Sequence, residues 1–186
     1  MPSQRREHLV QTAVQLFQKH GYHATGIDRI LAEAGVAKMT LYKHFRSKDE
    51  LILGALRQWD TESRNWLVRA IEARATDPGE RLLALFDVLG EWFESHDFNG
   101  CMFNNASAEF ADHEDPIHAA AAEHKRLFRN YLREQAVAIG AGDPDKLTQQ
   151  IALLMEGAIM TAQVSGNADS SVAAKDAAAI LIEASA

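Results

Sequence analysis

The most reactive side chain in this sequence is its single cysteine, Cys101. It lies in the run Asn-Gly-Cys-Met-Phe at 99–103, directly before a segment expected to form a short helix. A thiol near a helix N-terminus gains thiolate character, and a thiolate reacts with oxidants and electrophiles. A lone cysteine is also often a small buried hydrophobe. Because the chain has no second cysteine, an internal disulfide and a resolving thiol are both excluded.

Histidines and carboxylates gather between positions 112 and 124, and such side chains can bind metal ions. His118 and His124 are six residues apart, which places them on different faces of a helix, although His113 could bend towards His118. We therefore expect a solvated acidic helix start that complements the helix dipole, with no metal site and no cofactor. The group consists of Asp112, His113, Glu114, Asp115, His118 and His124.

No catalytic constellation is present, so we do not expect an enzyme. An all-α enzyme would need a signal such as a Glu-x-x-His pair for a di-iron bundle or a nucleophile with His and Asp at a recognisable spacing. A glycine-rich phosphate loop is missing as well.

Charge is distributed unevenly along the chain. Residues 1–51 contain eight Lys and Arg against five Asp and Glu, a net charge of +3. The remainder of the chain has a net charge of −10, so the whole chain has a net charge of −7. A basic head on an acidic body is typical of a DNA-binding segment carried by a domain with another task. No stretch is apolar enough to span a membrane, and residues 1–8 lack the apolar region of a signal peptide, so we expect a cytoplasmic protein.

Apolar residues recur at helical spacing along almost the whole chain, and no strand pattern of period two is present. Caps and breaks support the division: Ser47 and Glu50 form a capping-box pattern, and Asp77 precedes Pro78. The sequence thus predicts an all-α fold of about nine helices. They lie at about 9–20, 27–34, 37–45, 47–75, 78–93, 104–110, 116–140, 144–162 and 171–186.

Three short helices followed by a long one, with a glycine turn at 34–36, match the layout of a homeodomain-like helix-turn-helix. In that motif the third helix enters the DNA major groove, and Gly35 allows the tight turn before it.

The run 21–51 resembles the N-terminal domain of TetR/AcrR-like regulators through Gly21, Thr25, the 34–36 turn, the aromatic pair Tyr42 and Phe45, and Lys48. The resemblance implies a helix-turn-helix domain at 1–50 and a helical ligand-binding and dimerisation domain at 51–186. It further implies a homodimeric transcriptional regulator, a repressor that leaves a palindromic double-stranded operator when a small hydrophobic or electrophilic effector binds.

The resemblance also implies DNA contacts at defined positions. Thr25 would cap the second helix and contact a phosphate, and Tyr42, His44 and Lys48 would contact phosphates. Core packing is the alternative for Tyr42, and a solvated surface position is the alternative for Lys48. Base reading is expected from the exposed face of the third helix, at Lys38, Met39, Thr40 and Lys43.

Two residues depart from the usual pattern of the family. Ala37 stands where a serine is common, and Met39 stands where a small residue is common. These departures put the identity of the target sequence in doubt, while DNA binding itself is still expected.

Two features of the C-terminal part predict how it works. We expect the apolar stripe of the eighth helix (Leu147, Ile151, Leu154, Met155, Ala158, Ile159, Ala162) and the alanines of the last helix (Ala173, Ala174, Ala177, Ala178, Ala179) to form a dimer interface, with intrachain core as the alternative. A ligand pocket is expected between the fifth, seventh and eighth helices. Its candidate lining is Phe86, Trp92, Phe93, Cys101, Met102, Phe103, Phe110, Phe128 and Met155.

Simple core packing is the alternative for each of these lining residues. Regulation could also proceed through Cys101, because a subset of TetR-like regulators senses oxidants or electrophiles through a cysteine at this place, or through a protein partner.

Overall fold

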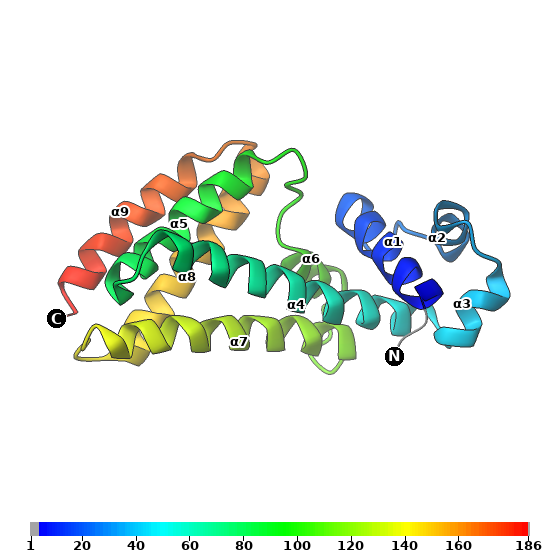
Figure 1. The fold of residues 1–186 in the computed structure, drawn as a ribbon, viewed down its shortest axis with the longest axis horizontal. Coiled ribbons are helices and arrows are strands. Elements are labelled where there is room, and N and C mark those ends of the chain that lie inside the picture. The colour runs from blue at the N-terminus through cyan, green and yellow to red at the C-terminus, as the bar shows by residue number, and fades with distance from the viewer. Residues whose placement is uncertain (1–3, 186) are drawn as a thin grey trace. The chain divides into compact units, whose positions relative to one another are not determined.

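The computed structural model describes residues 4–185, and all the regular elements within them are α-helices (Figure 1). This confirms the all-α prediction. The ends of the predicted helices shift by only a few residues. The helices are α1 Gln4–His20, α2 Ile27–Ala34, α3 Lys38–His44, α4 Lys48–Arg74, α5 Pro78–Glu94, α6 Met102–Glu109, α7 Pro116–Ala138, α8 Pro144–Ser165 and α9 Asp169–Glu183.

Local side chains start the long helices largely as the sequence predicted. Asp77 caps α5 and Asp143 caps α8, each by accepting hydrogen bonds from amides of the first turn. At the start of α4 the Ser47 hydroxyl accepts from the amide of Glu50, at 3.1 Å. The Glu50 carboxylate accepts from the amide of Arg46, at 2.7 Å, rather than from that of Ser47, so only half of the expected capping box forms.

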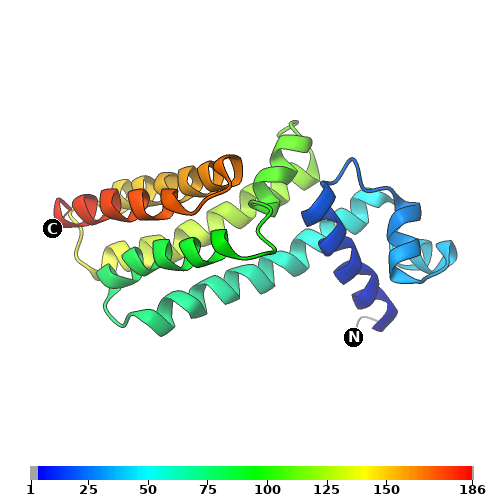
Figure 2. The same ribbon diagram turned by 90° about the horizontal axis from the view of Figure 1, so that it is seen from above.

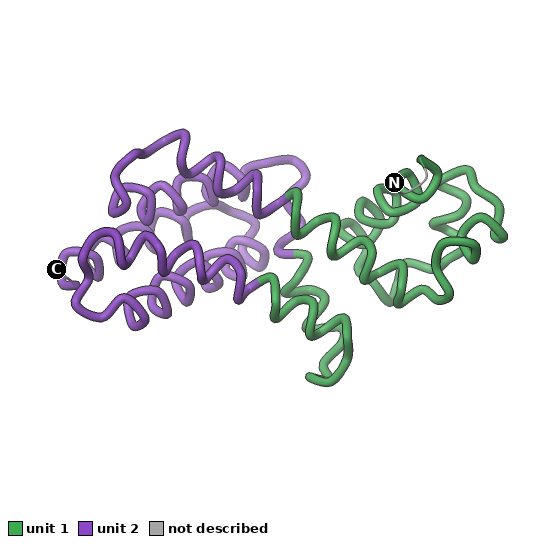
Figure 3. The backbone as a smooth tube through the Cα atoms, turned by 60° about the horizontal axis from the view of Figure 1, so that its bottom comes forward, with its two compact units in different colours: residues 1–62, 102–124 green, residues 63–101, 125–186 purple. Residues whose placement is uncertain are grey.

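The chain divides into two compact units (Figure 3). Unit 1 contains the described part of residues 1–62 together with 102–124, and unit 2 contains 63–101 and 125–185. The helices α4 and α7 contribute to both units. Because the division follows contacts rather than function, the domain boundary between residues 50 and 51 stays a prediction.

The core of unit 1 is built around residues of α1, α2, α3 and the α1–α2 turn. Phe17, Tyr22, Ile30 and Leu41 are each at most 1% exposed, and burial of such side chains contributes roughly 1.5–3 kcal/mol each. Between α2 and α3, Gly35 has a φ of +63° and caps α2, as the glycine turn predicted. The burial of these side chains and the Gly35 turn fix the angle between α2 and α3.

In unit 2, α9 packs along both α5 and α8, and Figure 2 shows α8 and α9 side by side. Ile151, Met155 and Ile159 of α8 are buried inside the chain, as are Ala174 and Ala178 of α9. The α8 stripe is therefore intrachain core, and its assignment to a dimer interface is wrong. Small residues let α9 approach α5 closely, because a β-carbon on Gly90 would lie only 2.8 Å from the Ser171 hydroxyl.

Candidate DNA-binding surface and regulatory core

The helix α3 is anchored by one buried side chain and presents the predicted base-reading residues to solvent. Leu41 is fully buried, whereas Lys38 and Lys43 are exposed and Thr40 is half-buried. Met39 is 85% exposed, so a large apolar side chain projects into water beside two lysines. This combination offers ammonium donors and an apolar contact on one short helix, as major-groove reading requires.

The residues predicted to contact phosphates lie in the second half of α3 and at the start of α4. Tyr42 is 46% exposed, so core packing does not account for it. His44 is half-buried at the end of α3, while the neighbouring Phe45 is buried under the guanidinium of Arg6, which lies 4.9 Å from the ring centroid. Lys48 occupies the first turn of α4 and donates to the carbonyl oxygen of His23, at 3.5 Å.

Thr25 has a different role from the one the sequence predicted. It is fully buried, and its hydroxyl donates to the carbonyl oxygen of Gly21 at 2.7 Å, which closes the α1–α2 turn. The N-cap of α2 is Gly26, and no side chain caps this helix. The expectation that Thr25 caps α2 is therefore wrong. A phosphate contact in this segment would have to use the free amides at the α2 N-terminus.

A carboxylate of α6 holds the α1–α2 turn, and sequence analysis did not find it. Glu109 accepts hydrogen bonds from the amides of Tyr22 and His23 and from the His23 ring. Partial burial acts to raise the pKa of Glu109, but these hydrogen bonds and the nearby imidazole outweigh it and lower that pKa. The charged carboxylate is therefore the form that fits this turn.

The predicted ligand-lining residues fall into both units. Phe86, Trp92, Phe93, Cys101, Phe128 and Met155 belong to unit 2, and Met102, Phe103 and Phe110 belong to unit 1. All are buried except Trp92 and Phe110, which are half-buried.

The rings of the unit 2 candidates gather in part. Trp92 and Phe93 contact each other and also Phe98, with ring centroids 4.9–5.8 Å apart, and Phe98 was not among the predicted residues. Phe110, in unit 1, stacks on His23 at 4.8 Å and thus contributes to the head instead.

The buried Cys101 lies beside a half-buried ion pair in unit 2. Its sulfur accepts a hydrogen bond from the Lys125 ammonium at 3.4 Å, and Lys125 also pairs with Glu156 at 2.7 Å. Burial acts to lower the pKa of Lys125, but the Cys101 sulfur and the Glu156 carboxylate outweigh it and raise that pKa. Sequence spacing could not reveal the cluster, because Lys125 is 24 residues from Cys101 and 31 from Glu156.

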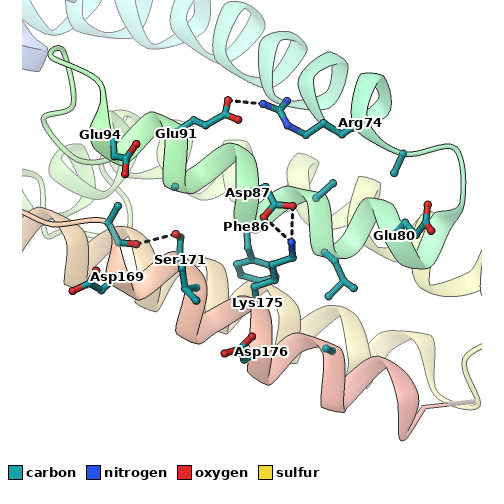
Figure 4. Close-up of a pocket in the computed structure, with 17 residues that line it drawn as sticks. Arg74, Glu80, Phe86, Asp87, Glu91, Glu94, Asp169, Ser171, Lys175 and Asp176 are labelled. Carbon is teal, nitrogen blue, oxygen red and sulfur yellow. Dashed lines mark hydrogen bonds and ion pairs between the residues drawn. The ribbon is translucent and has the colours of Figure 1, made fainter.

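A groove of about 1080 Å³ lies between α5, α9 and the end of α4 (Figure 4). Of the predicted ligand residues, only Phe86 lines it, so it is not the pocket that the sequence placed between the fifth, seventh and eighth helices. Its rim is acidic, and its two cations are paired, Lys175 with Asp87 and Arg74 with Glu91. The acidic side chains that line it are Glu80, Asp87, Glu91, Glu94, Asp169 and Asp176.

Comparison with known families assigns both halves of the chain. Residues 9–55 match the family described as bacterial regulatory proteins, tetR family, and residues 78–178 match the tetracyclin repressor-like C-terminal domain. The chain belongs to the TetR family. It is a helix-turn-helix DNA-binding transcriptional regulator with the helical C-terminal domain of that family.

Individual TetR-family proteins resemble this chain over most of its length. The crystal structure of SCO4454, a TetR-family regulator from Streptomyces coelicolor, superposes with a TM-score of 0.89 at 31% identity and covers 97% of this chain and 95% of that one. The regulator LmrA of Bacillus subtilis is 26% identical, with 87% of this chain and 88% of LmrA aligned. The repressor DhaR of Mycobacterium sp. strain GP1 is also 26% identical, with 87% and 84% aligned.

Residues 4–185 of this TetR-family chain contain neither a candidate metal site nor a membrane-spanning helix. No group of three or more His, Cys, Asp or Glu side chains there could hold a metal ion, and His124 instead pairs with Asp60 at 2.7 Å. None of the helices in this range is long and apolar enough to cross a membrane.

Removal of one partner of the Lys125–Glu156 pair should destabilise the protein. In Glu156→Gln the half-buried ammonium loses its carboxylate, and we expect the free energy of unfolding to fall by about 1–3 kcal/mol in urea titrations. The double variant Lys125→Met/Glu156→Gln should recover most of this loss, because no unpaired charge is left. Asp145→Asn, which breaks the exposed pair with Arg133, is the control and should change the midpoint far less. A Glu156→Gln variant as stable as the wild type would contradict the structural role of the pair.

Proposed function

We propose that this protein is a cytoplasmic homodimeric repressor. Each α3 enters the major groove of one half of a palindromic operator, and a small hydrophobic or electrophilic effector bound in the C-terminal part releases the DNA. The observation that supports DNA reading most directly is the exposed face of α3, where Lys38, Met39 and Lys43 stand around the buried Leu41. The repressor DhaR, over most of whose length this chain aligns, supports repression rather than activation.

Separate residues are proposed for positioning and for reading. Tyr42, His44 and Lys48 would bond phosphates and set the register of the head on DNA, without reading sequence. Lys38, Met39, Thr40 and Lys43 would contact base edges. A dimer is needed because two heads must engage half-sites about one helical turn, or a multiple of one, apart.

A second copy of the chain is the partner we propose for an exposed apolar face of α8 and α9. Leu153, Met160 and Val164 follow one another at helical spacing on α8 and are 48–81% exposed. Val172 and Ile180 of α9 are 62% and 68% exposed, and α9 packs directly along α8. A monomer would leave these five side chains in water, whereas a four-helix contact between two copies would bury them.

We further propose that the effector binds among the buried aromatic and Met residues of unit 2, with Phe86, Phe93, Phe128 and Met155 as its apolar contacts. The roles predicted for Trp92, Met102, Phe103 and Phe110 stay predictions. Cys101 is held by Lys125 in the same unit, and we adopt a ligand-controlled switch as the function rather than control through this thiol.

Substitutions in the head should separate phosphate contacts from base contacts. On duplexes selected by the wild-type protein from a random library, Lys48→Ala should weaken binding to every sequence alike. It should also reduce the slope of log K against log salt by about 1.8, because each of the two subunits loses one phosphate contact. Met39→Ala should change sequence preference at one position per half-site. Gel-shift titrations at several salt concentrations measure both effects, with Lys146→Ala as the control for charge. A salt slope that Lys48→Ala leaves unchanged would contradict the phosphate role.

Charge placed on the proposed interface should separate the copies. Leu153→Glu/Val164→Glu introduces unpaired carboxylates where a dimer would bury apolar surface, so we expect a monomer of 20.6 kDa by light scattering and a loss of operator binding. Val137→Glu alters an apolar residue of α7 that is 50% exposed and lies off this face, and it should remain a dimer. A double variant that stays dimeric would place the interface elsewhere.

An effector should stabilise the protein and release DNA together. At a concentration about 100 times its dissociation constant, a compound that binds only the folded protein adds about 2.7 kcal/mol of stability, which a thermal-shift screen detects. By linkage, a true effector must also weaken operator binding, measured by fluorescence anisotropy. Compounds that raise the melting temperature and leave operator affinity unchanged would count against an effector-released repressor.

A further inference from the structure

The short helix α6 contacts the α1–α2 turn at both of its ends. At its start, the carbonyl oxygen of Met102 accepts a hydrogen bond from the buried Tyr22 hydroxyl at 2.9 Å. At its end, Glu109 accepts from the amide of Tyr22 at 2.8 Å and from the amide of His23 at 2.6 Å. The His23 ring nitrogen lies 2.8 Å from the same carboxylate. Two adjacent residues of the head are thus held by α6 through four polar contacts.

The turn is shaped to receive this carboxylate. Gly21 has a φ of +78°, and a β-carbon at this position would lie 2.8 Å from the Glu109 Oε1 atom. A larger residue would be both strained and in collision with the carboxylate. The two amides that follow Gly21 point at Glu109, so the turn acts as a small anion-binding site that a side chain of the same chain occupies.

From this turn the contact continues to a DNA-binding residue. The His23 amide donates to Glu109, and the His23 carbonyl oxygen accepts from the Lys48 ammonium at 3.5 Å. One peptide segment therefore links a carboxylate of α6 to the lysine proposed to contact a phosphate. Glu109 contacts His23, and His23 in turn contacts the Lys48 ammonium.

We propose that Glu109 is a positioning residue for DNA binding, which fixes the α1–α2 turn and thereby holds Lys48 where it meets a phosphate. Loss of the Glu109 carboxylate releases this turn, and DNA affinity then falls in proportion to the fraction of molecules that leave the binding conformation. The inference rests on the proposed function only in that Lys48 contacts DNA.

The sign of the effect distinguishes positioning from simple charge. Removal of any carboxylate makes a protein less repelled by DNA, so a generic loss of negative charge should strengthen binding. Glu109→Gln removes the same charge and also replaces one of the two acceptor oxygens by an NH2 donor, so either the Tyr22 amide or the His23 amide loses its acceptor. A loss of affinity in this variant therefore cannot arise from charge. Glu114→Gln is the matched control, because Glu114 is exposed just beyond α6.

The test uses the full chain and a non-specific 30-base-pair duplex, on which phosphate contacts dominate binding. Fluorescence anisotropy at several salt concentrations compares the wild type with Glu109→Gln, Glu114→Gln, Lys48→Ala and the double variant Glu109→Gln/Lys48→Ala. Amide hydrogen exchange reports the turn directly, and melting curves report folding. Glu109→Asp, which keeps the charge and withdraws the carboxylate by one methylene, serves if Glu109→Gln is poorly folded.

We expect Glu109→Gln to weaken DNA binding about tenfold, or about 1.4 kcal/mol. We also expect it to flatten the salt dependence as Lys48→Ala does and to speed amide exchange at residues 22 and 23. In the Lys48→Ala background the same substitution should change affinity less than about twofold, because both act through one contact. Glu114→Gln should bind at least as tightly as the wild type.

Two results would overturn this inference and leave the proposed function standing. One is a Glu109→Gln protein that binds as tightly as the wild type while Lys48→Ala weakens binding. The other is a Glu109→Gln effect of equal size in both backgrounds, which would make Glu109 a general stabiliser. A wild-type protein without measurable affinity for duplex DNA would overturn the proposed function and this inference together.

Discussion

A helix of seven residues is too short to be stable alone in water, so α3 depends on side chains that fasten it to the rest of the head. Leu41 supplies the main attachment from within α3, and the buried Phe45 supplies it directly after the helix. The other side chains of α3 are not needed to hold the helix and can face solvent. The exposed Lys38, Met39 and Lys43 can point at DNA because the helix is held without them.

The head in turn depends on the turn between α1 and α2. Thr25 closes this turn from inside through the carbonyl oxygen of Gly21, and Glu109 holds it from outside through two amides. The bond from the Tyr22 amide to Glu109 is partly buried and the bond from the exposed His23 is open to water, so Glu109 stabilises the turn mainly through Tyr22. The contact thus couples a helix outside the three-helix head to the geometry of that head.

Unit 2 shows how one amphipathic element serves two surfaces. On α8 the stripe that contains Ile151 and Met155 is core, whereas Leu153 and Val164 project from another face. Ala174 and Ala178 let α9 approach its neighbours closely, and Val172 and Ile180 project away from them. On α9, small residues inside and large apolar residues outside reverse the usual arrangement, as expected if the outer face is buried in the proposed dimer.

The sequence by itself determined the helices, the Asp77 cap of α5 and the helix-turn-helix, because these depend on residues close together in the chain. Apolar periodicity located the helices, Gly35 marked the turn, and Asp77 with Pro78 marked the start of α5. Contacts between distant residues were decided only by the tertiary structure. The Thr25 side chain points inward, and Glu109 binds His23 and Tyr22, which precede it by 86 and 87 positions. Lys125 binds a cysteine that precedes it by 24 positions. Periodicity shows which face of a helix is apolar, but which apolar face is covered depends on the neighbours that the fold brings to it.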